Sequence, residues 1–423
     1  MKNFLLMSLG VVLTSCYLFP FELVYLPGLN FKMLMAGLSI PLLMINLARR
    51  SDSLIEKDFI IVSLFTLPIT IFSLLTTVIN GTSDESFTYY FVSVFVWMGA
   101  AYFLSNVLKA IHGEISMKVM IQYLIAVCCL QCVLALTMEY FPSLQVSIDG
   151  VIGGSEMFMT DGGGRLHGIG CALDVAGGRF AAVLVMTSVL MVKATTRVEI
   201  GIYLLAFSVI AVVGNMMART TTIGLIISAL VIVVSICYHK PAVESLGRMV
   251  LTFVIAVFIV VALAYNSNSL FRQNLRFGFE GFFSLVETGH WQTGSNDILL
   301  NHMVVFPDNY KTWIIGDGYC SNPSEWDPFY TGKKYHGFYK GTDIGYLRYI
   351  FYFGILGALA MLAFFTCVGC LCIKRHNRYK LLIILLMILN MILLVKATTD
   401  LLPIFALLFC LPIAGDTNRV IIE

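Results

Sequence analysis

Residues 200–237 read IGIYLLAFSVIAVVGNMMARTTTIGLIISALVIVVSIC, and they decide the class of fold that the chain adopts. The stretch is apolar at nearly every position and carries one charged residue, Arg219, near its middle. A helix needs about 20 apolar residues to cross the hydrocarbon core of a bilayer. The stretch therefore predicts two membrane-spanning helices that meet at a very short turn, with Arg219 in that turn.

The rest of the chain continues this pattern. Of its 423 residues, 58% are hydrophobic and only 12% are charged, and the mean hydropathy is +0.86, far above the values of soluble domains. We predict an all-α polytopic membrane protein that forms one integral membrane domain over residues 1–423. About twelve spans are expected, near residues 4–20, 31–48, 59–79, 88–108, 119–138, 176–192, 200–218, 220–237, 249–265, 344–372, 381–399 and 401–415.

Basic residues set the expected orientation, because cytoplasmic loops of membrane proteins are enriched in Lys and Arg. An N-terminus inside the cell places more than half of the 27 basic residues in the cytoplasm, together with the C-terminus. Two longer segments then lie outside, at about residues 139–178 and 266–342, the second of them just before the tenth span. A long loop with many aromatic residues is typical of a functional segment rather than a disordered one.

Charge and cysteine content exclude several other classes of function. The 27 basic and 25 acidic residues nearly balance, so nothing in the charge predicts a nucleic-acid partner. Most of the 11 cysteines lie in apolar runs, where cysteine behaves as a small hydrophobic residue. The Cys367–Cys370 spacing lacks companion histidines. We therefore expect neither a metal site nor a cofactor.

Two arginines interrupt the glycine-rich stretch TDGGGRLHGIGCALDVAGGRF (residues 160–180): Arg165 and Arg179. Only thirteen apolar residues separate Arg179 from Lys193, and they would span about 20 Å of a core that is about 30 Å thick. The helix should therefore begin upstream of Arg179 and draw it below the outer surface. A thinned bilayer or a re-entrant segment is the alternative.

Three further arginines point to an anionic ligand. Arg219 sits at or below the membrane interface, where a cation is costly and is a functional candidate by default. Arg272 and Arg276 form an i, i+4 pair that we expect on one face of a short interfacial helix. Because guanidinium forks bind phosphate oxygens in pairs, the group predicts a lipid pyrophosphate site. Snorkelling, a buried ion pair or contact with lipid headgroups are the structural alternatives.

Three stretches resemble a known family at this point. They are GGGRLHGIG (162–170), ARTTTIGLIISAL (218–230) and YKGTDIGYLRYIFYFGILG (339–357), the last preceded by TGSNDILLNHMVVFPDNYKTWIIGDGY (293–319). Their order and spacing are similar to those of the bacterial O-antigen and capsular polysaccharide polymerases, of the Wzy type, which share a fold with the O-antigen ligases. The resemblance covers roughly residues 139–357, and the earlier spans match by hydropathy alone.

The resemblance implies a glycosyltransferase of the bacterial inner membrane. Such a polymerase transfers a growing glycan from undecaprenyl pyrophosphate to a sugar hydroxyl of the next lipid-linked repeat, at the periplasmic face and without metal or cofactor. Its expected partners are the undecaprenyl-pyrophosphate-linked oligosaccharide, the membrane lipid and a chain-length regulator protein. An O-antigen ligase is the nearest alternative. A lipid-linked oligosaccharide flippase, which is not an enzyme, is the other, although no internal repeat of the transporter kind is visible.

The resemblance also implies roles for single residues. The pyrophosphate would be bound by arginines drawn from Arg165, Arg179, Arg219, Arg272, Arg276 and Arg348. At the position where ligases carry a histidine, this chain has Asp343, which would accept the proton of the acceptor hydroxyl, with His336 as a rival base. Aromatic side chains of the second external segment would pack on sugar faces or form the core of the loop: Trp291, Trp313, Tyr319, Trp326 and Tyr335.

Overall fold

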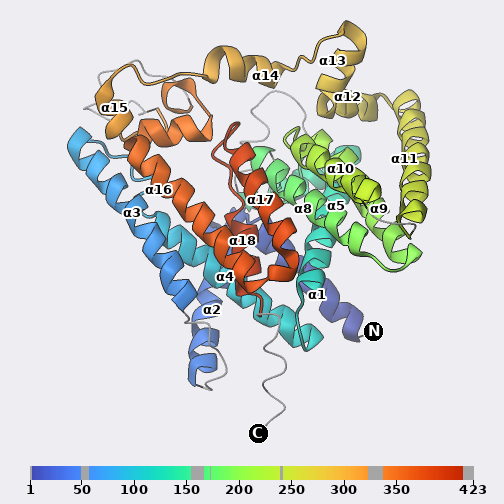
Figure 1. Ribbon diagram of the computed structural model, residues 1–423, viewed down its shortest axis with the longest axis horizontal. Coiled ribbons are helices and arrows are strands. Elements are labelled where there is room, and N and C mark those ends of the chain that lie inside the picture. Colours follow the sequence, from blue (N-terminus) through green and yellow to red (C-terminus); the bar gives the residue numbers. More distant parts are fainter. Residues whose placement is uncertain are drawn as a thin grey trace. The chain divides into compact units, whose positions relative to one another are not determined.

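The computed structural model describes residues 2–48, 57–153, 166–171, 173–238, 242–322 and 337–412. Contacts between residues divide the chain into two compact units, which are described separately below. The first unit comprises residues 1–35 and 103–291, and the second comprises residues 36–102 and 292–423. Helices dominate both units (Figure 1). The expected all-α membrane fold is confirmed at this level.

Nine of the described helices lie wholly within the first unit. They are α1 (Lys2–Leu18), α5 (Met117–Tyr140), α6 (Pro142–Asp149), α8 (Leu173–Lys193), α9 (Arg197–Met217), α10 (Thr221–Tyr238), α11 (Ala242–Ser267), α12 (Ser269–Gly278) and α13 (Glu280–Thr288). Two further helices, α2 (Phe31–Ala48) and α4 (Tyr90–His112), have residues in both units.

Helix α8 forms the core of the first unit. Every residue from Ala176 to Met191 is buried, because α5, α9 and α10 all pack against it. The approach of α10 is closest at Gly224, where an added Cβ would overlap the backbone of Ala181. Small residues allow helix backbones to come this close within a membrane. The helix also begins six residues before Arg179, which confirms the prediction that it starts upstream of that arginine.

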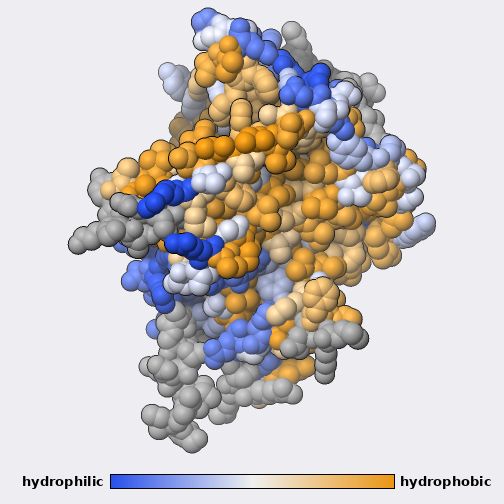
Figure 2. Space-filling model, turned by 90° about the vertical axis from the view of Figure 1, so that its right-hand side faces the viewer, coloured by the Kyte–Doolittle hydropathy of each residue, from blue (hydrophilic) through white to orange (hydrophobic). Residues whose placement is uncertain are grey.

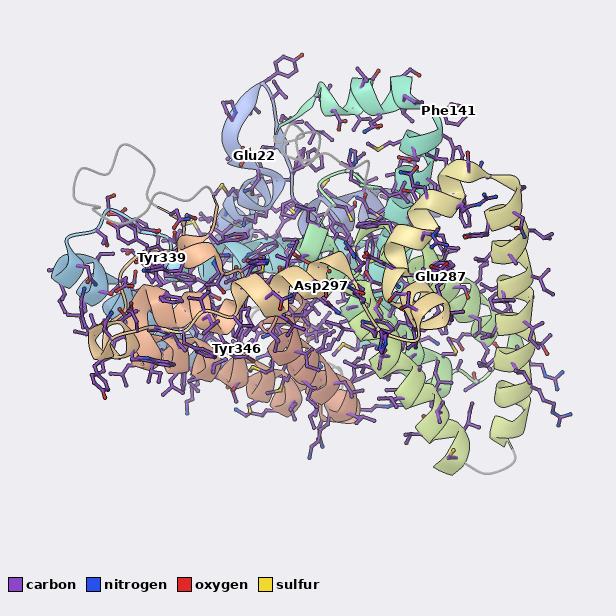
Figure 3. All side chains as sticks on the ribbon, turned by 90° about the horizontal axis from the view of Figure 1, so that it is seen from above. Glu22, Phe141, Glu287, Asp297, Tyr339 and Tyr346 are labelled. Carbon is purple, nitrogen blue, oxygen red and sulfur yellow. The ribbon has the colours of Figure 1, made fainter. Side chains whose placement is uncertain are left out.

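A small antiparallel sheet joins the loops of the first unit. Strand β1 (Glu22–Leu23) lies between β2 (Leu26–Asn30) and β3 (Ile152–Gly153). Glu22 pairs with Asn30 on one side and with Gly153 on the other. Figure 3 labels Glu22 on this sheet. The sheet therefore ties the segment that follows α1 to the segment that follows α6.

The second unit is built around one long helix, α16 (Gly345–Arg375). The other elements of this unit are α3 (Lys57–Asn80), α14 (Gly294–Ile298), the π-helix η1 (Leu299–Met303), α15 (Tyr310–Ile314), α17 (Lys380–Leu393), α18 (Leu402–Cys410) and the 3₁₀ turns η2 (Tyr339–Gly341) and η3 (Asn377–Tyr379). Residues 266–342, for which the sequence predicted a long external segment, form α12–α15, η1 and η2 within their described part.

Helix α16 is interrupted at Phe353 and Gly354, whose backbone angles are not helical. Gly354 has φ +70°, and a Cβ there would overlap the carbonyl group of Ile314 at the end of α15. The following turn packs equally tightly, since a Cβ on Gly316 (φ +84°) would overlap the carbonyl group of Tyr352. The Trp313–Gly318 segment therefore packs against the break in α16, and these close contacts fix the position of the segment.

Seven of the described helices are long and apolar enough to cross a membrane: α3, α4, α5, α8, α9, residues Gly247–Ser267 of α11, and α16. Three shorter apolar helices occupy Phe4–Leu18, Phe31–Asn46 and Thr221–Cys237. Helix α11 exposes Leu251, Phe258 and Leu263 and lies at the edge of its unit, and hydrophobic residues cover much of the face on that side (Figure 2). Such a surface is suited to contact with lipid.

The twelve expected spans are not confirmed in the last part of the chain. The expected spans at 381–399 and 401–415 correspond to α17 and α18, which have only 14 and 9 residues. Helices of these lengths reach about 21 and 14 Å, short of a core of about 30 Å. Every residue of α18 is buried. Its apolar residues therefore face other protein segments instead of lipid.

Candidate functional site

Arg179 is a buried residue of α8 in the first unit. Its Nη1 donates a hydrogen bond to the carbonyl oxygen of Leu18 at the end of α1, and its guanidinium lies 5.5 Å from the centre of the Phe19 ring. These contacts fasten α1 to α8. Arg179 is therefore buried within the protein, and its contacts favour a structural role for this arginine.

Arg219 lies in the turn between α9 and α10, as the sequence predicted. Ala218 ends α9 in an extended conformation, and α10 begins at Thr221. The turn is fixed to α8, because Thr220 Oγ1 donates to Asp174 Oδ1 (2.6 Å). A Cβ on Gly177 of α8 would lie 2.8 Å from the Thr220 Cβ. The turn between α9 and α10 therefore packs on the first turns of α8.

The guanidinium of Arg219 is directed toward α13. Its Nη1 donates to Glu280 Oε2, and it lies 4.4 Å from the centre of the Phe277 ring. The Arg219 side chain is 18% exposed and the Glu280 side chain 40%. Gly278 permits this arrangement, since a Cβ there would come within 2.8 Å of the Asn215 backbone. Close contact between α12 and the end of α9 thus brings Glu280 to Arg219.

Arg272 and Arg276 share one face of α12, as expected, because both contact Tyr265 at the end of α11. Arg272 donates to the carbonyl oxygens of Tyr265 (2.9 Å) and Asn266 (3.2 Å). Arg276 forms an ion pair with Glu287 of α13 (2.8 Å), which Figure 3 labels. The hydrogen bond from Arg276 holds the pKa of the Glu287 carboxyl below its usual range.

Glu280 and Glu287 lie near the two ends of α13. They form ion pairs with Arg219 and Arg276, two of the arginines predicted to bind phosphate. An anion that binds at Arg219 or Arg276 must compete with these side chains. Neither carboxylate was predicted as a partner of these arginines from the sequence. No local signal identifies them, because the pairs join residues 61 and 11 positions apart.

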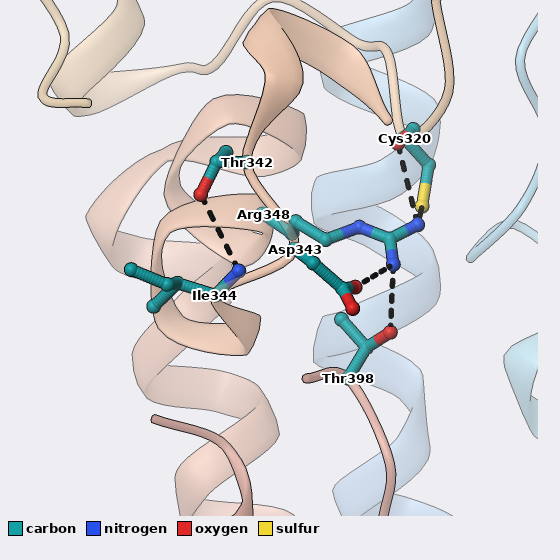
Figure 4. A network of polar contacts seen from close by, with 6 residues as sticks. All are labelled: Cys320, Thr342, Asp343, Ile344, Arg348 and Thr398. Atoms are coloured by element: carbon teal, nitrogen blue, oxygen red, sulfur yellow. Dashed lines mark hydrogen bonds and ion pairs between the residues drawn. The ribbon is translucent and has the colours of Figure 1, made fainter. Parts of the chain in front are cut away.

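In the second unit, Asp343 and Arg348 come together at the start of α16. Nη1 of Arg348 donates to Asp343 Oδ1 (3.1 Å) and also to Thr398 Oγ1 (2.9 Å). Nη2 donates to the carbonyl oxygen (3.3 Å) and the Sγ atom (2.9 Å) of Cys320. Figure 4 shows these partners around the guanidinium. Arg348 therefore contacts the Asp343 carboxylate directly.

The Arg348 partners come from segments that are themselves anchored. The backbone N–H of Cys320 donates to Asp84 Oδ2 (2.7 Å), and Asp317 accepts from Thr312 (2.7 Å) and from the Tyr339 hydroxyl (3.1 Å). Burial raises the pKa of the Cys320 thiol, while the Arg348 charge opposes that shift. The result is a fixed polar cluster of a carboxylate, a guanidinium, a hydroxyl and a thiol.

The aromatic residues proposed for sugar contacts differ in exposure. Tyr319 is buried and stacks on Tyr339 at 5.5 Å, so it belongs to the loop core. Trp313 stacks on Phe306 at 6.4 Å and donates to the carbonyl oxygen of Pro307. Trp291, in the first unit, is 46% exposed. Trp313 and Trp291 therefore stay candidates, and Trp326 and Tyr335 lie outside the described residues.

The predicted site residues fall into two groups. The first unit holds Arg179, Arg219, Arg272 and Arg276, and the second holds Arg348 and Asp343; Arg165 and His336 lie outside the described residues. Each of these described arginines contacts side chains or carbonyl oxygens of the protein. Within the part of the chain that is described, no three His, Cys, Asp or Glu side chains could hold a metal ion together.

Comparisons of the chain with protein-family models, with curated proteins and with solved structures find no match.

Proposed function

We propose that the protein is a polymerase of lipid-linked oligosaccharide repeats, of the O-antigen or capsule type, in the bacterial inner membrane. The observation that carries the proposal is the contact between the α9–α10 turn and the start of α8. The turn belongs to the polymerase-like stretch 218–230, and Asp174 and Gly177 belong to the small-residue helix that follows the polymerase-like stretch 162–170 in sequence. The seven membrane-length helices support a lipid-linked substrate.

The first unit is assigned the donor. Arg219, with help from Arg165, Arg272 or Arg276, binds the pyrophosphate of the undecaprenyl-linked glycan. Oxygens of the pyrophosphate replace the Glu280 carboxylate, whose side chain is 40% exposed, at the Arg219 guanidinium. As the bond between the sugar C1 and the phosphate oxygen breaks, negative charge grows on the pyrophosphate, and fixed guanidinium groups stabilise it.

The second unit is assigned the removal of the proton from the acceptor hydroxyl. Asp343 accepts the proton from a sugar hydroxyl of the incoming lipid-linked repeat while that oxygen bonds to the donor C1. Arg348 contacts one oxygen of the carboxylate and orients it. The product is a glycan longer by one repeat, together with free undecaprenyl pyrophosphate. A protein that regulates chain length is the expected partner at the periplasmic face.

A reconstituted assay tests the function directly. The purified protein in liposomes, supplied with lipid-linked repeats alone, should produce a ladder of lipid-linked oligomers without added nucleotide sugar or metal. Release of undecaprenyl pyrophosphate should match the number of linkages formed. An absence of oligomers from folded, liposome-embedded protein, tested with the lipid-linked repeats of the source cell, would contradict the proposal.

Deletion of the gene separates the proposal from its alternatives. Loss of a polymerase leaves single repeats on the surface, loss of a ligase leaves polymer that is not attached to lipid A core, and loss of a flippase leaves neither outside. Gel analysis of surface glycan distinguishes these three patterns.

A further inference from the structure

The segment between α17 and α18, residues 394–401, reads LVKATTDL, and most of it falls within the membrane span that was expected at residues 381–399. In the structure the segment is not helical beyond a turn at its start. It carries Lys396, Thr398 and Asp400 in the unit that contains Asp343 and Arg348. A polar, irregular segment amid apolar helices is tolerated only where protein surrounds it or where it lines a polar site.

This segment is held firmly against the start of α16. The backbone N–H of Leu401 donates to Asn390 Oδ1 (2.7 Å), which joins the end of the segment to α17. The hydroxyl of Tyr346 donates to the Met391 carbonyl oxygen (2.7 Å). A Cβ on Gly345 would lie 2.8 Å from the carbonyl oxygen of Ala397. The position of Thr398 relative to α16 is therefore well determined.

Thr398 shares one nitrogen of Arg348 with Asp343. Nη1 donates one hydrogen to Asp343 Oδ1 (3.1 Å) and the other to Thr398 Oγ1 (2.9 Å), while Nη2 is turned toward Cys320. The two nitrogens of the guanidinium thus serve different partners and do not form a fork on the Asp343 carboxylate. A forked pair would stabilise the ionised carboxylate more strongly and make it a weaker base.

We propose that Thr398 is a positioning residue that fixes the Arg348 guanidinium, so that Arg348 orients Asp343 through a single hydrogen bond. The role in chain growth rests on the function proposed above for Asp343. Thr398 itself contacts neither sugar nor phosphate. Its loss frees one hydrogen of Nη1, and the guanidinium turns from Cys320 toward both oxygens of Asp343.

The test of the catalytic consequence uses Thr398→Val, which replaces the hydroxyl by a methyl group. We expect kcat for oligomer formation in liposomes to fall about tenfold, the loss typical of one hydrogen bond to a charged group, with KM for the lipid-linked repeat unchanged. Thr398→Ser should restore kcat. Thr399→Val, on the adjacent threonine, is the matched control and should behave as wild type.

A second measurement reads the geometry without any catalytic activity. Alkylation of Cys320 by a maleimide, followed over pH by mass spectrometry of its peptide, reports the charge beside the thiol. If Arg348 leaves Cys320, the thiolate forms at higher pH, so the labelling profile of Thr398→Val should move to higher pH, and that of Thr399→Val should not. Thr398→Ala provides the same test if the valine variant does not fold.

Each outcome decides the proposal. An unshifted labelling profile in folded Thr398→Val and Thr398→Ala overturns it, whatever the activity. A shifted profile with unchanged kcat also overturns it, because Thr398 would then hold Arg348 without serving the reaction. If wild-type protein forms no oligomers, the proposed function fails, and the labelling profiles still decide whether Thr398 fixes Arg348.

Discussion

Arg219 donates a hydrogen bond to the carboxylate of Glu280, across a contact that joins the α9–α10 turn to α13. The arginine at the break between two apolar helices is thus neutralised by an acidic residue of a separate segment. The Glu280 side chain is 40% exposed, so the pair can exchange its carboxylate for another anion. The predicted anion site can therefore be tested by substitution of Arg219 and, separately, by substitution of Glu280.

Replacement of Arg219 should remove the donor site. Arg219→Ala is expected to lower the rate of oligomer formation by about 10²- to 10³-fold, because one fixed donor to the developing anion is lost. Arg219→Lys should recover only part of the rate, since an ammonium cannot form the fork. Quantified ladders and protein levels measure the effect. Arg197→Ala, at the other end of α9, is the control, and full-length polymer from Arg219→Ala would rule out the site.

Replacement of Glu280 should have the opposite effect on binding. Glu280→Gln keeps the shape and removes the charge that competes with pyrophosphate for Arg219. An ion pair this exposed is worth about 0.2–1 kcal/mol, so KM for the lipid-linked donor should fall by about 1.4- to 5-fold. The exposed Glu114→Gln should leave KM unchanged. A KM for Glu280→Gln that is equal to or above that of wild type would mean that Arg219 and Glu280 form a structural pair only.

Asp343→Asn preserves the side-chain shape and removes the proton acceptor. Chain growth should fall by about 10²- to 10⁴-fold, while lipid-linked repeats still bind. His336→Ala should be milder, and Asp308→Asn, which is exposed, serves as the control. Normal growth by Asp343→Asn together with collapse in His336→Ala would assign the base to His336.

Gly224→Ala tests the core of the first unit. The added methyl group would overlap the Ala181 backbone, which cannot move aside as a flexible side chain would, so α10 must separate from α8. Overpacking of this kind costs about 1–3 kcal/mol, and thermal unfolding in detergent should show a lower midpoint. Gly201→Ala has open space around its Cβ and should unfold at or above the wild-type temperature. Equal midpoints for the two variants would contradict the close packing.

Topology is tested by cysteine labelling from the outside of intact cells. Tyr310 and Asn377 are both exposed and belong to the second unit. With Cys237 and Cys370 changed to Ser, a membrane-impermeant maleimide should label Tyr310→Cys and not Asn377→Cys. The reverse pattern would invert the predicted orientation.

The sequence alone determined the class of fold, the location of most helices and the place of Arg219 in a turn. These features follow from local hydropathy and from the rise per residue of a helix, both of which are properties of consecutive residues. The early start of α8 before Arg179 could be predicted for the same reason. Asp343, just before α16, contacts Arg348 in the first turn of that helix over only five positions, so this pairing is also a local one.

Only the tertiary structure decided which partners surround these residues. Glu280 meets Arg219 over a separation of 61 positions, and Thr398 meets Arg348 over 50, and no local pattern encodes such pairings. Hydropathy also failed to distinguish lipid from protein interior: α18 is as apolar as a membrane span, yet it is short and buried on all sides. Both environments exclude water and favour the same side chains, so only the packing of the other helices separates them.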